Sequence, residues 1–191
     1  MTTHRPHTGM ADTWMYILVC FALAALVCAA KNYISVSLMD TPVCAVLCPS
    51  LFGDRAFSLI PSLNWLFSLQ INTEAQLQTL FNSLLNDRFL LLTGLLVAPI
   101  LEEGIYRGPL YIFRQWSDHG HWWTAALVLT ILFALSHSVA ALSLLPLITL
   151  GILSVWLIAR TRRFWPSVVL HFLYNFFMLS VTVLQSFYWV D

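Results

Sequence analysis

Two adjacent glutamates, Glu102 and Glu103, lie in the otherwise apolar run 97–107, which ends in Arg107. A carboxylate at the centre of a bilayer costs roughly 3 kcal/mol or more to insert, so we expect these side chains to have a function. On a helix, Glu103 and Arg107 are four residues apart, share a face and can form an ion pair. Glu102 points about 100° away and has only Tyr106 at the corresponding spacing. We therefore interpret Glu103 and Arg107 as supporting residues and Glu102 as the free carboxylate, although both acids could instead serve only to tie helices together.

Two further polar clusters occur inside apolar stretches. Phe133 and His137 are four residues apart, as are His171 and Asn175, so each pair would share one face of a helix. Either cluster alone is typical of a hydrogen-bonded contact between membrane helices. Together with Glu102, they can activate water: the glutamate takes a proton from water beside one histidine, and the other histidine and the amide donate to the resulting oxyanion. The same glutamate and two histidines could instead hold Zn²⁺ with an open fourth position.

The composition indicates the environment in which these clusters work. Of the 191 residues, 59% are hydrophobic and only 9% are charged, with a mean hydropathy of +0.78. Soluble domains carry about 25% charged residues, so the sequence predicts an integral membrane protein whose main partner is the lipid bilayer. The length allows one domain, 1–191. The formal net charge of zero and the absence of a basic run exclude a nucleic-acid partner.

The apolar stretches predict an all-α polytopic bundle. We expect membrane helices in 13–30, 89–113, 119–159 and 164–190. The third stretch is too long for one span and predicts two helices, broken near 137–143 or at Pro146. This makes five firm spans, and a sixth is possible around 57–69, giving about five to six transmembrane helices. We interpret 13–30 as a retained first helix, although it also resembles a signal peptide.

Residues 31–88 form a predicted connecting segment outside the core, with short interfacial or re-entrant helices between prolines. Within it, Cys44 and Cys48 could form a disulfide if the segment faces an oxidising compartment. Cys20 and Cys28 fall in the first span and are expected to be small core residues.

Basic residues predict the orientation, because short cytoplasmic loops are rich in lysine and arginine. Arginines occur in the loop after the second span, with Arg107 and Arg114, and in the loop 160–163 between the last two spans. They place both of these loops and the N-terminus on the cytoplasmic side.

The three motifs E-E-x-x-x-R (Glu102, Glu103, Arg107), F-x-x-x-H (Phe133, His137) and H-x-x-x-N (His171, Asn175) resemble those of the CPBP family. This family comprises CAAX-type and bacteriocin-processing intramembrane glutamic proteases, which include short bacterial myxosortase-like members. The resemblance covers the predicted catalytic core, 89–177, about half of the chain. It is specific because it combines all three motifs in order.

The resemblance implies a role for each residue. Glu102 would be the base that activates water, assisted by His137, while His171 and Asn175 would stabilise the oxyanion. Glu103 and Arg107 would support the geometry. The resemblance favours a reaction without a cofactor or metal, and the alternative is a zinc protease with Glu102, His137 and His171 as ligands.

The predicted function is that of an intramembrane endopeptidase, a multi-pass protein of the bacterial inner membrane. Its substrate would be a membrane-anchored protein or peptide, cleaved in C-terminal processing or in removal of a sorting tail. Two alternatives are a non-catalytic scaffold or immunity protein of the same fold, and a proton or cation conductor, which would also use glutamate and histidine in the membrane.

Overall fold

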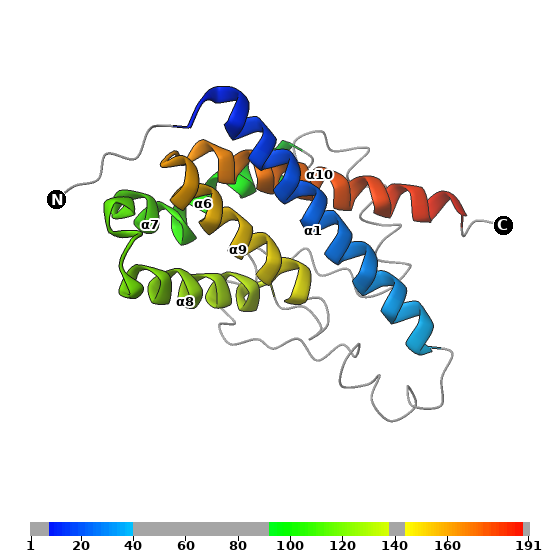
Figure 1. The fold of residues 1–191 in the computed structure, drawn as a ribbon. Coiled ribbons are helices and arrows are strands. Elements are labelled where there is room, and N and C mark those ends of the chain that lie inside the picture. The colour runs from blue at the N-terminus through cyan, green and yellow to red at the C-terminus, as the bar shows by residue number, and fades with distance from the viewer. Residues whose placement is uncertain (1–7, 40–91, 138–143, 189–191) are drawn as a thin grey trace.

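The computed structural model describes residues 8–39, 92–137 and 144–188, and its regular elements in these ranges are all helices (Figure 1). They are α1 (Met10–Met39), the π-helix η1 (Thr93–Val97), α6 (Ala98–Tyr106), α7 (Gly108–Ile112), the 3₁₀-helix η2 (Arg114–Trp116), α8 (Gly120–Ser136), α9 (Leu144–Thr161) and α10 (Trp165–Tyr188). The all-α prediction is therefore confirmed for the described part of the chain. The possible span at 57–69 and the cysteines Cys44 and Cys48 lie outside the described residues.

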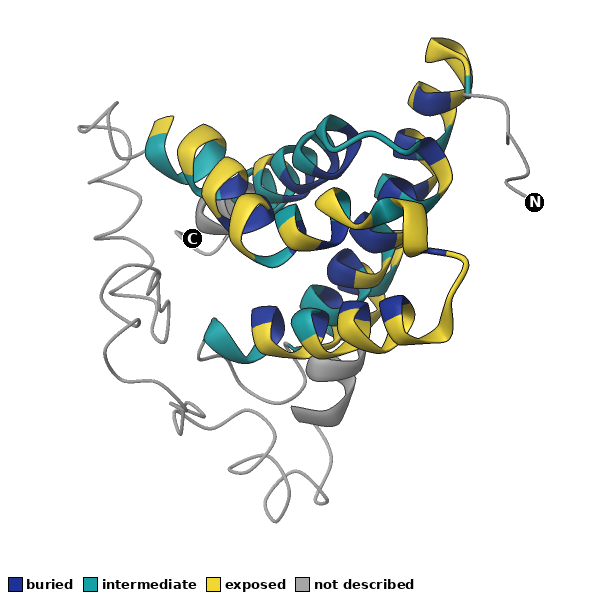
Figure 2. Ribbon diagram, turned by 90° about the vertical axis from the view of Figure 1, so that its left-hand side faces the viewer, coloured by how far each residue is buried: buried dark blue, intermediate teal, exposed yellow. Residues whose placement is uncertain are grey.

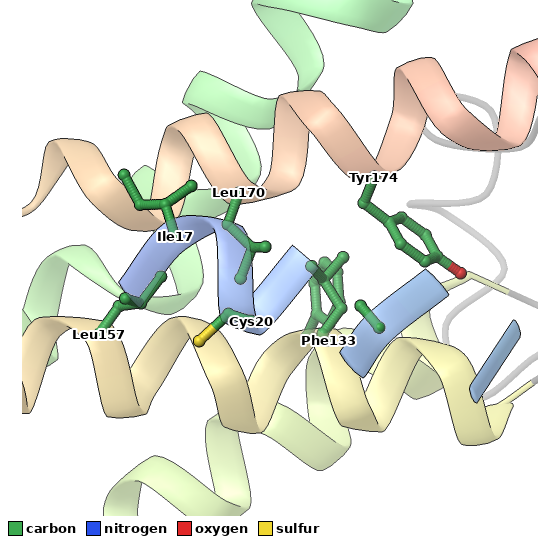
Figure 3. Close-up of a cluster of buried hydrophobic side chains, with 8 residues drawn as sticks. Ile17, Cys20, Phe133, Leu157, Leu170 and Tyr174 are labelled. Carbon is green, nitrogen blue, oxygen red and sulfur yellow. The ribbon is translucent and has the colours of Figure 1, made fainter. Parts of the chain in front are cut away.

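Helix α9 lies at the centre of the bundle, in contact with α1, α8 and α10, and α1 also packs on α10 (Figure 1). Apolar side chains from these four helices meet in one cluster (Figure 3). Its fully buried members are Ile17, Cys20, Ala24, Phe133, Leu150, Leu157, Leu170 and Tyr174. Cys20 and Cys28 are free and buried, as predicted for small core residues. The cluster joins the ends of the described chain and thereby fixes α10, which carries one of the predicted site motifs.

The outward faces of the helices are apolar as well, and Figure 2 shows how the exposed residues follow the outer side of the bundle. On α8, the exposed side chains include Trp123, Leu127, Val128, Ile131 and Leu132. A helix that is apolar all round suits a lipid environment. Two helical stretches in the described residues, Met10–Lys31 and Leu144–Thr161, are long and apolar enough to cross a membrane, whereas Gly120–Ser136 and Trp165–Val181 are shorter apolar helices. The number of spans stays a prediction.

Several helix boundaries differ from the predicted ones. The helix expected over 89–113 is interrupted at Arg107, because Pro109 in the next turn has no N–H with which to continue the helical hydrogen bonds. The first helix continues to Met39 rather than ending at Ala30. The expected break within 119–159 follows α8, which ends at Ser136, and Pro146 lies in the first turn of α9, where proline is tolerated.

The loop arginines gather at one end of the bundle. Arg162 donates to the carbonyl of Arg114 and lies 3.7 Å from the Asp118 carboxylate. Arg160 Nη2 donates to the Tyr16 hydroxyl of α1 at 3.1 Å. The loops around 114–118 and 160–163 therefore lie at the same end, as the predicted orientation requires, while the side of the membrane that this end faces stays a prediction. Arg107 is different, because its side chain is fully buried and belongs to the interior.

Candidate active site

Helix α6 turns its two acids inward and its apolar side chains outward. Glu102 and Glu103 are 7% and 0% exposed, whereas Ile100, Leu101 and Ile105 are at least half exposed. A soluble protein would reverse this pattern, but in a membrane the outer face meets lipid and polar groups face the interior. The helix therefore presents both carboxylates to α10 and α8, with which it packs.

The carboxylate of Glu102 lies between two imidazoles from different helices. Its Oε2 atom is 3.6 Å from His137 Nε2, at the end of α8, and 3.5 Å from His171 Nε2, on α10. These distances are longer than direct hydrogen bonds and short enough for strong electrostatic interaction. Histidine side chains separated by 34 residues thus converge on one carboxylate oxygen. The predicted association of Glu102 with both histidines is present in the structure.

The opposite nitrogen of each ring fixes the way the ring faces. His137 Nδ1 lies 2.8 Å from the carbonyl oxygen of Phe133, one helical turn earlier. His171 Nδ1 lies 3.0 Å from Glu103 Oε1. Since a carbonyl and a carboxylate can only accept, each Nδ1 donates its proton to a group other than Glu102, and each Nε2 faces Glu102. Both histidines are thereby held in the orientation that directs one exchangeable nitrogen to the same oxygen.

Glu103 contacts both His171 and Arg107. Its Oε1 atom lies 3.5 Å from Arg107 Nη1, which agrees with the pairing expected from their spacing. The same atom accepts the hydrogen bond from His171. Glu103 therefore connects Arg107 to His171, a contact that helical spacing alone does not reveal.

The guanidinium of Arg107 is inserted between α8 and α9. It lies over the Phe133 ring, with 4.0 Å between Cζ and the ring centroid. A Cβ atom placed on Gly151 of α9 would come within 2.7 Å of Arg107 Nη2 and 2.6 Å of Thr130 Cγ2. Gly151 is thus required by this close approach. It was not among the predicted site residues, although an isolated glycine inside an apolar helix often marks a packing constraint.

Phe133 explains the aromatic position of the F-x-x-x-H motif. Its side chain is fully buried and its ring makes edge-type contacts with His137, at 4.7 Å between ring centroids, and with His171, at 5.6 Å. The same ring supports Arg107. One apolar side chain therefore contacts both imidazole rings and the guanidinium that pairs with Glu103.

Asn175 lies one helical turn beyond His171, but its recorded contact is with a different partner. Its Nδ2 atom donates to the carbonyl oxygen of Gly94, in η1, at 3.3 Å. One connected group is formed by Glu102, Glu103, His137 and His171. Asn175 instead binds η1, the π-helix that precedes α6. Its role in stabilising an oxyanion stays a prediction.

The donor set of Glu102, His137 and His171 has the chemistry of a zinc site, because each histidine presents Nε2 and holds Nδ1 on an acceptor. Within the described ranges, however, no group of three histidine, cysteine, aspartate or glutamate side chains has the arrangement of a metal site.

Comparisons with known proteins place this site in a family context. A family model with the description "Type II CAAX prenyl endopeptidase Rce1-like" matches residues 84–177, a range that contains all three predicted motifs. No curated protein and no solved structure gives a significant match to the chain.

Proposed function

The chain belongs to the family of Rce1-like type II CAAX prenyl endopeptidases, and on this premise we propose that it hydrolyses a peptide bond by means of a glutamate-activated water. The observation that carries the proposal is the position of Glu102 Oε2, 3.5 and 3.6 Å from the Nε2 atoms of two oriented histidines. Three proton-exchanging atoms from three helices converge there, which is the requirement for general acid–base chemistry at one reacting centre.

In the first step, the Glu102 carboxylate accepts a proton from a water molecule, and the oxygen of that water attacks the carbonyl carbon of the scissile bond. His137 stands beside the base and orients the water through Nε2. The attack forms a tetrahedral intermediate whose oxygen carries the negative charge. In its imidazolium form, His171 donates to this oxyanion from Nε2 while Nδ1 keeps its hydrogen bond to Glu103.

In the second step, Glu102 returns the proton to the amide nitrogen, the carbon–nitrogen bond breaks and an amine and a carboxylic acid leave. Glu103 and Arg107 take no part in the proton transfers. Their role is to hold His171 through its Nδ1 atom, so that its Nε2 atom faces the reacting groups. Buried and oriented dipoles of this kind lower a barrier because they need no rearrangement during the reaction.

The surroundings of the site support a substrate that lies in the membrane. Glu102 and His171 are almost fully buried, while the His137 side chain is 21% exposed, so access is from the end of α8. The outward faces of α6 and α8 are apolar and suit a bilayer. We therefore propose a multi-pass enzyme of a bacterial cell membrane that cleaves a membrane-anchored protein or peptide near its C-terminus.

The test uses the purified full-length protein in proteoliposomes with two fluorogenic probes, a farnesylated CAAX peptide and an unprenylated single-span peptide with a polar C-terminal tail. We expect cleavage of at least one probe and a loss of about a thousandfold or more in Glu102→Gln. The matched control is Asp12→Asn, which makes the same chemical change at an exposed carboxylate of α1 and should retain full activity.

The same assay with a metal chelator tests the glutamic mechanism separately. We expect unchanged rates in the chelator. Inhibition that added Zn²⁺ reverses would replace the metal-free step by zinc chemistry, and unchanged turnover in Glu102→Gln would refute the role of this residue altogether.

A further inference from the structure

The helical segment that leads into the acids of α6 contains a break in its hydrogen-bond pattern. Residues 93–97 form a π-helix, and the N–H of Ala98 reaches back five residues to the carbonyl of Thr93. In an α-helix this N–H would bond to the carbonyl of Gly94 instead. The π-turn therefore passes over Gly94, and short π-segments of this kind are frequent at functional sites.

Pro99 prevents a backbone donor from restoring the missing hydrogen bond to the Gly94 carbonyl. Pro99 follows Ala98 in the first turn of α6 and has no N–H. If the π pattern continued by one residue, position 99 would supply the donor for Gly94. Neither Ala98 nor Pro99 thus donates to the Gly94 carbonyl. In an apolar membrane environment such a carbonyl needs a donor from a neighbouring helix.

Asn175 supplies that donor. Its Nδ2 atom donates to the Gly94 carbonyl oxygen at 3.3 Å, across a separation of 81 residues in the chain. Both η1 and α6 pack on α10, which carries Asn175. His171 projects from the same face of α10 one turn earlier and contacts both acids of α6. On α10, Asn175 therefore binds the π-helix, and His171, one turn earlier, contacts the two carboxylates that follow it.

We propose that Asn175 is a positioning residue that compensates for Pro99 and fixes the register in which α6 presents Glu102 to the histidines. A π-turn adds one residue to a helical turn, so loss of the π-turn would rotate α6 by about 100° relative to the segment before it. The hydrogen bond from Asn175 stabilises the π-turn and prevents this change. The consequence for catalysis rests on the proposed function, whereas the structural role of Asn175 does not.

A double-mutant cycle between Asn175 and Pro99 tests the proposal. Alanine at position 99 restores an N–H that can reach the Gly94 carbonyl, so the side chain of Asn175 is no longer needed there. We expect Asn175→Ala alone to lower kcat for the cleaved probe peptide by roughly tenfold to a hundredfold with little change in KM. In the Pro99→Ala background, the same substitution should change kcat less than about threefold.

Amide hydrogen exchange in peptides that cover 93–106 provides a readout that does not depend on cleavage. Asn175→Ala should accelerate exchange in this segment by roughly tenfold to a hundredfold, and the Pro99→Ala/Asn175→Ala double variant should exchange as Pro99→Ala does. Failure of the protease assay would leave this measurement intact. Equal kcat losses in both backgrounds, with unchanged exchange in 93–106, would overturn the proposal and assign Asn175 to the reacting atoms.

Discussion

The two carboxylates of α6 are neighbours in the chain and occupy different surroundings. Glu102 faces the Nε2 atoms of two histidines without a direct hydrogen bond, on the side where His137 is partly exposed. Glu103 is fully buried, accepts a hydrogen bond from His171 and lies beside a fully buried guanidinium. The outer carboxylate lies between two imidazole rings, whereas the inner one lies between one of these rings and a buried guanidinium.

Under the proposed function, one short helix supplies both the reacting group, Glu102, and its support, Glu103. Successive residues on a helix point about 100° apart, so adjacent acids cannot face the same partners unless a side chain reaches between them. The His171 ring does so, because its two nitrogens contact the two carboxylates separately. Substitutions that distinguish the outer carboxylate from the inner one therefore test the assignment of roles.

The largest effect on stability is expected from removing the negative charge of Glu103. Glu103→Gln leaves Arg107 buried without its anion, and breaking a buried pair costs about 3–5 kcal/mol. The apparent Tm in detergent should fall by at least roughly 6 °C, with cleavage reduced as well. Glu102→Gln is the matched variant on the same helix. It should abolish cleavage and keep the wild-type Tm, and an equal Tm loss in both variants would contradict the division of roles.

Substitutions of the two histidines should also differ in their effect on Tm, by smaller amounts than the two glutamates. His171→Ala removes the hydrogen bond to the buried Glu103 carboxylate, which is worth about 1.5–3 kcal/mol for a charged partner. We expect a Tm lower by roughly 3–12 °C and loss of cleavage. His137→Ala, whose side chain is partly exposed, should lower cleavage about a hundredfold or more with a Tm close to that of wild type. Thermal unfolding and cleavage rates measured on both variants decide the point.

The smallest effect on activity is expected from overpacking the contact between α9 and Arg107. Gly151→Ala places a methyl group against Arg107 Nη2 and Thr130, and overpacking of this kind costs about 1–3 kcal/mol. The Tm should fall by roughly 2–12 °C, and cleavage should weaken as Arg107 shifts away from Glu103. Gly104→Ala is the control, because the added Cβ would meet no atom within 4 Å in the described part of the chain, apart from its chain neighbours and the backbone of its own helix. Equal Tm values for the two alanine variants would exclude the close approach of Arg107 to α9.

Helical spacing was sufficient to predict the pairs within one helix. Glu103 with Arg107, four residues apart, forms the expected pair because both positions lie on one face. The break between α8 and α9 was also predictable, since a stretch of that length cannot form one span. The end of α6 at Tyr106 was not predicted, because the expected helix over 89–113 followed the apolar pattern and gave no weight to Pro109, which lacks the N–H needed to continue the helix.

The sequence by itself determined the membrane environment, the helical class and the residue types of the site, because these depend on composition and on spacing within single helices. The tertiary structure decided which groups meet: His171 between two carboxylates, Arg107 against Gly151, and Asn175 on the carbonyl of Gly94. Contacts between helices depend on their crossing, their length and the places where prolines interrupt them. A periodic pattern records the face that a side chain occupies, but the partner on that face is set by packing.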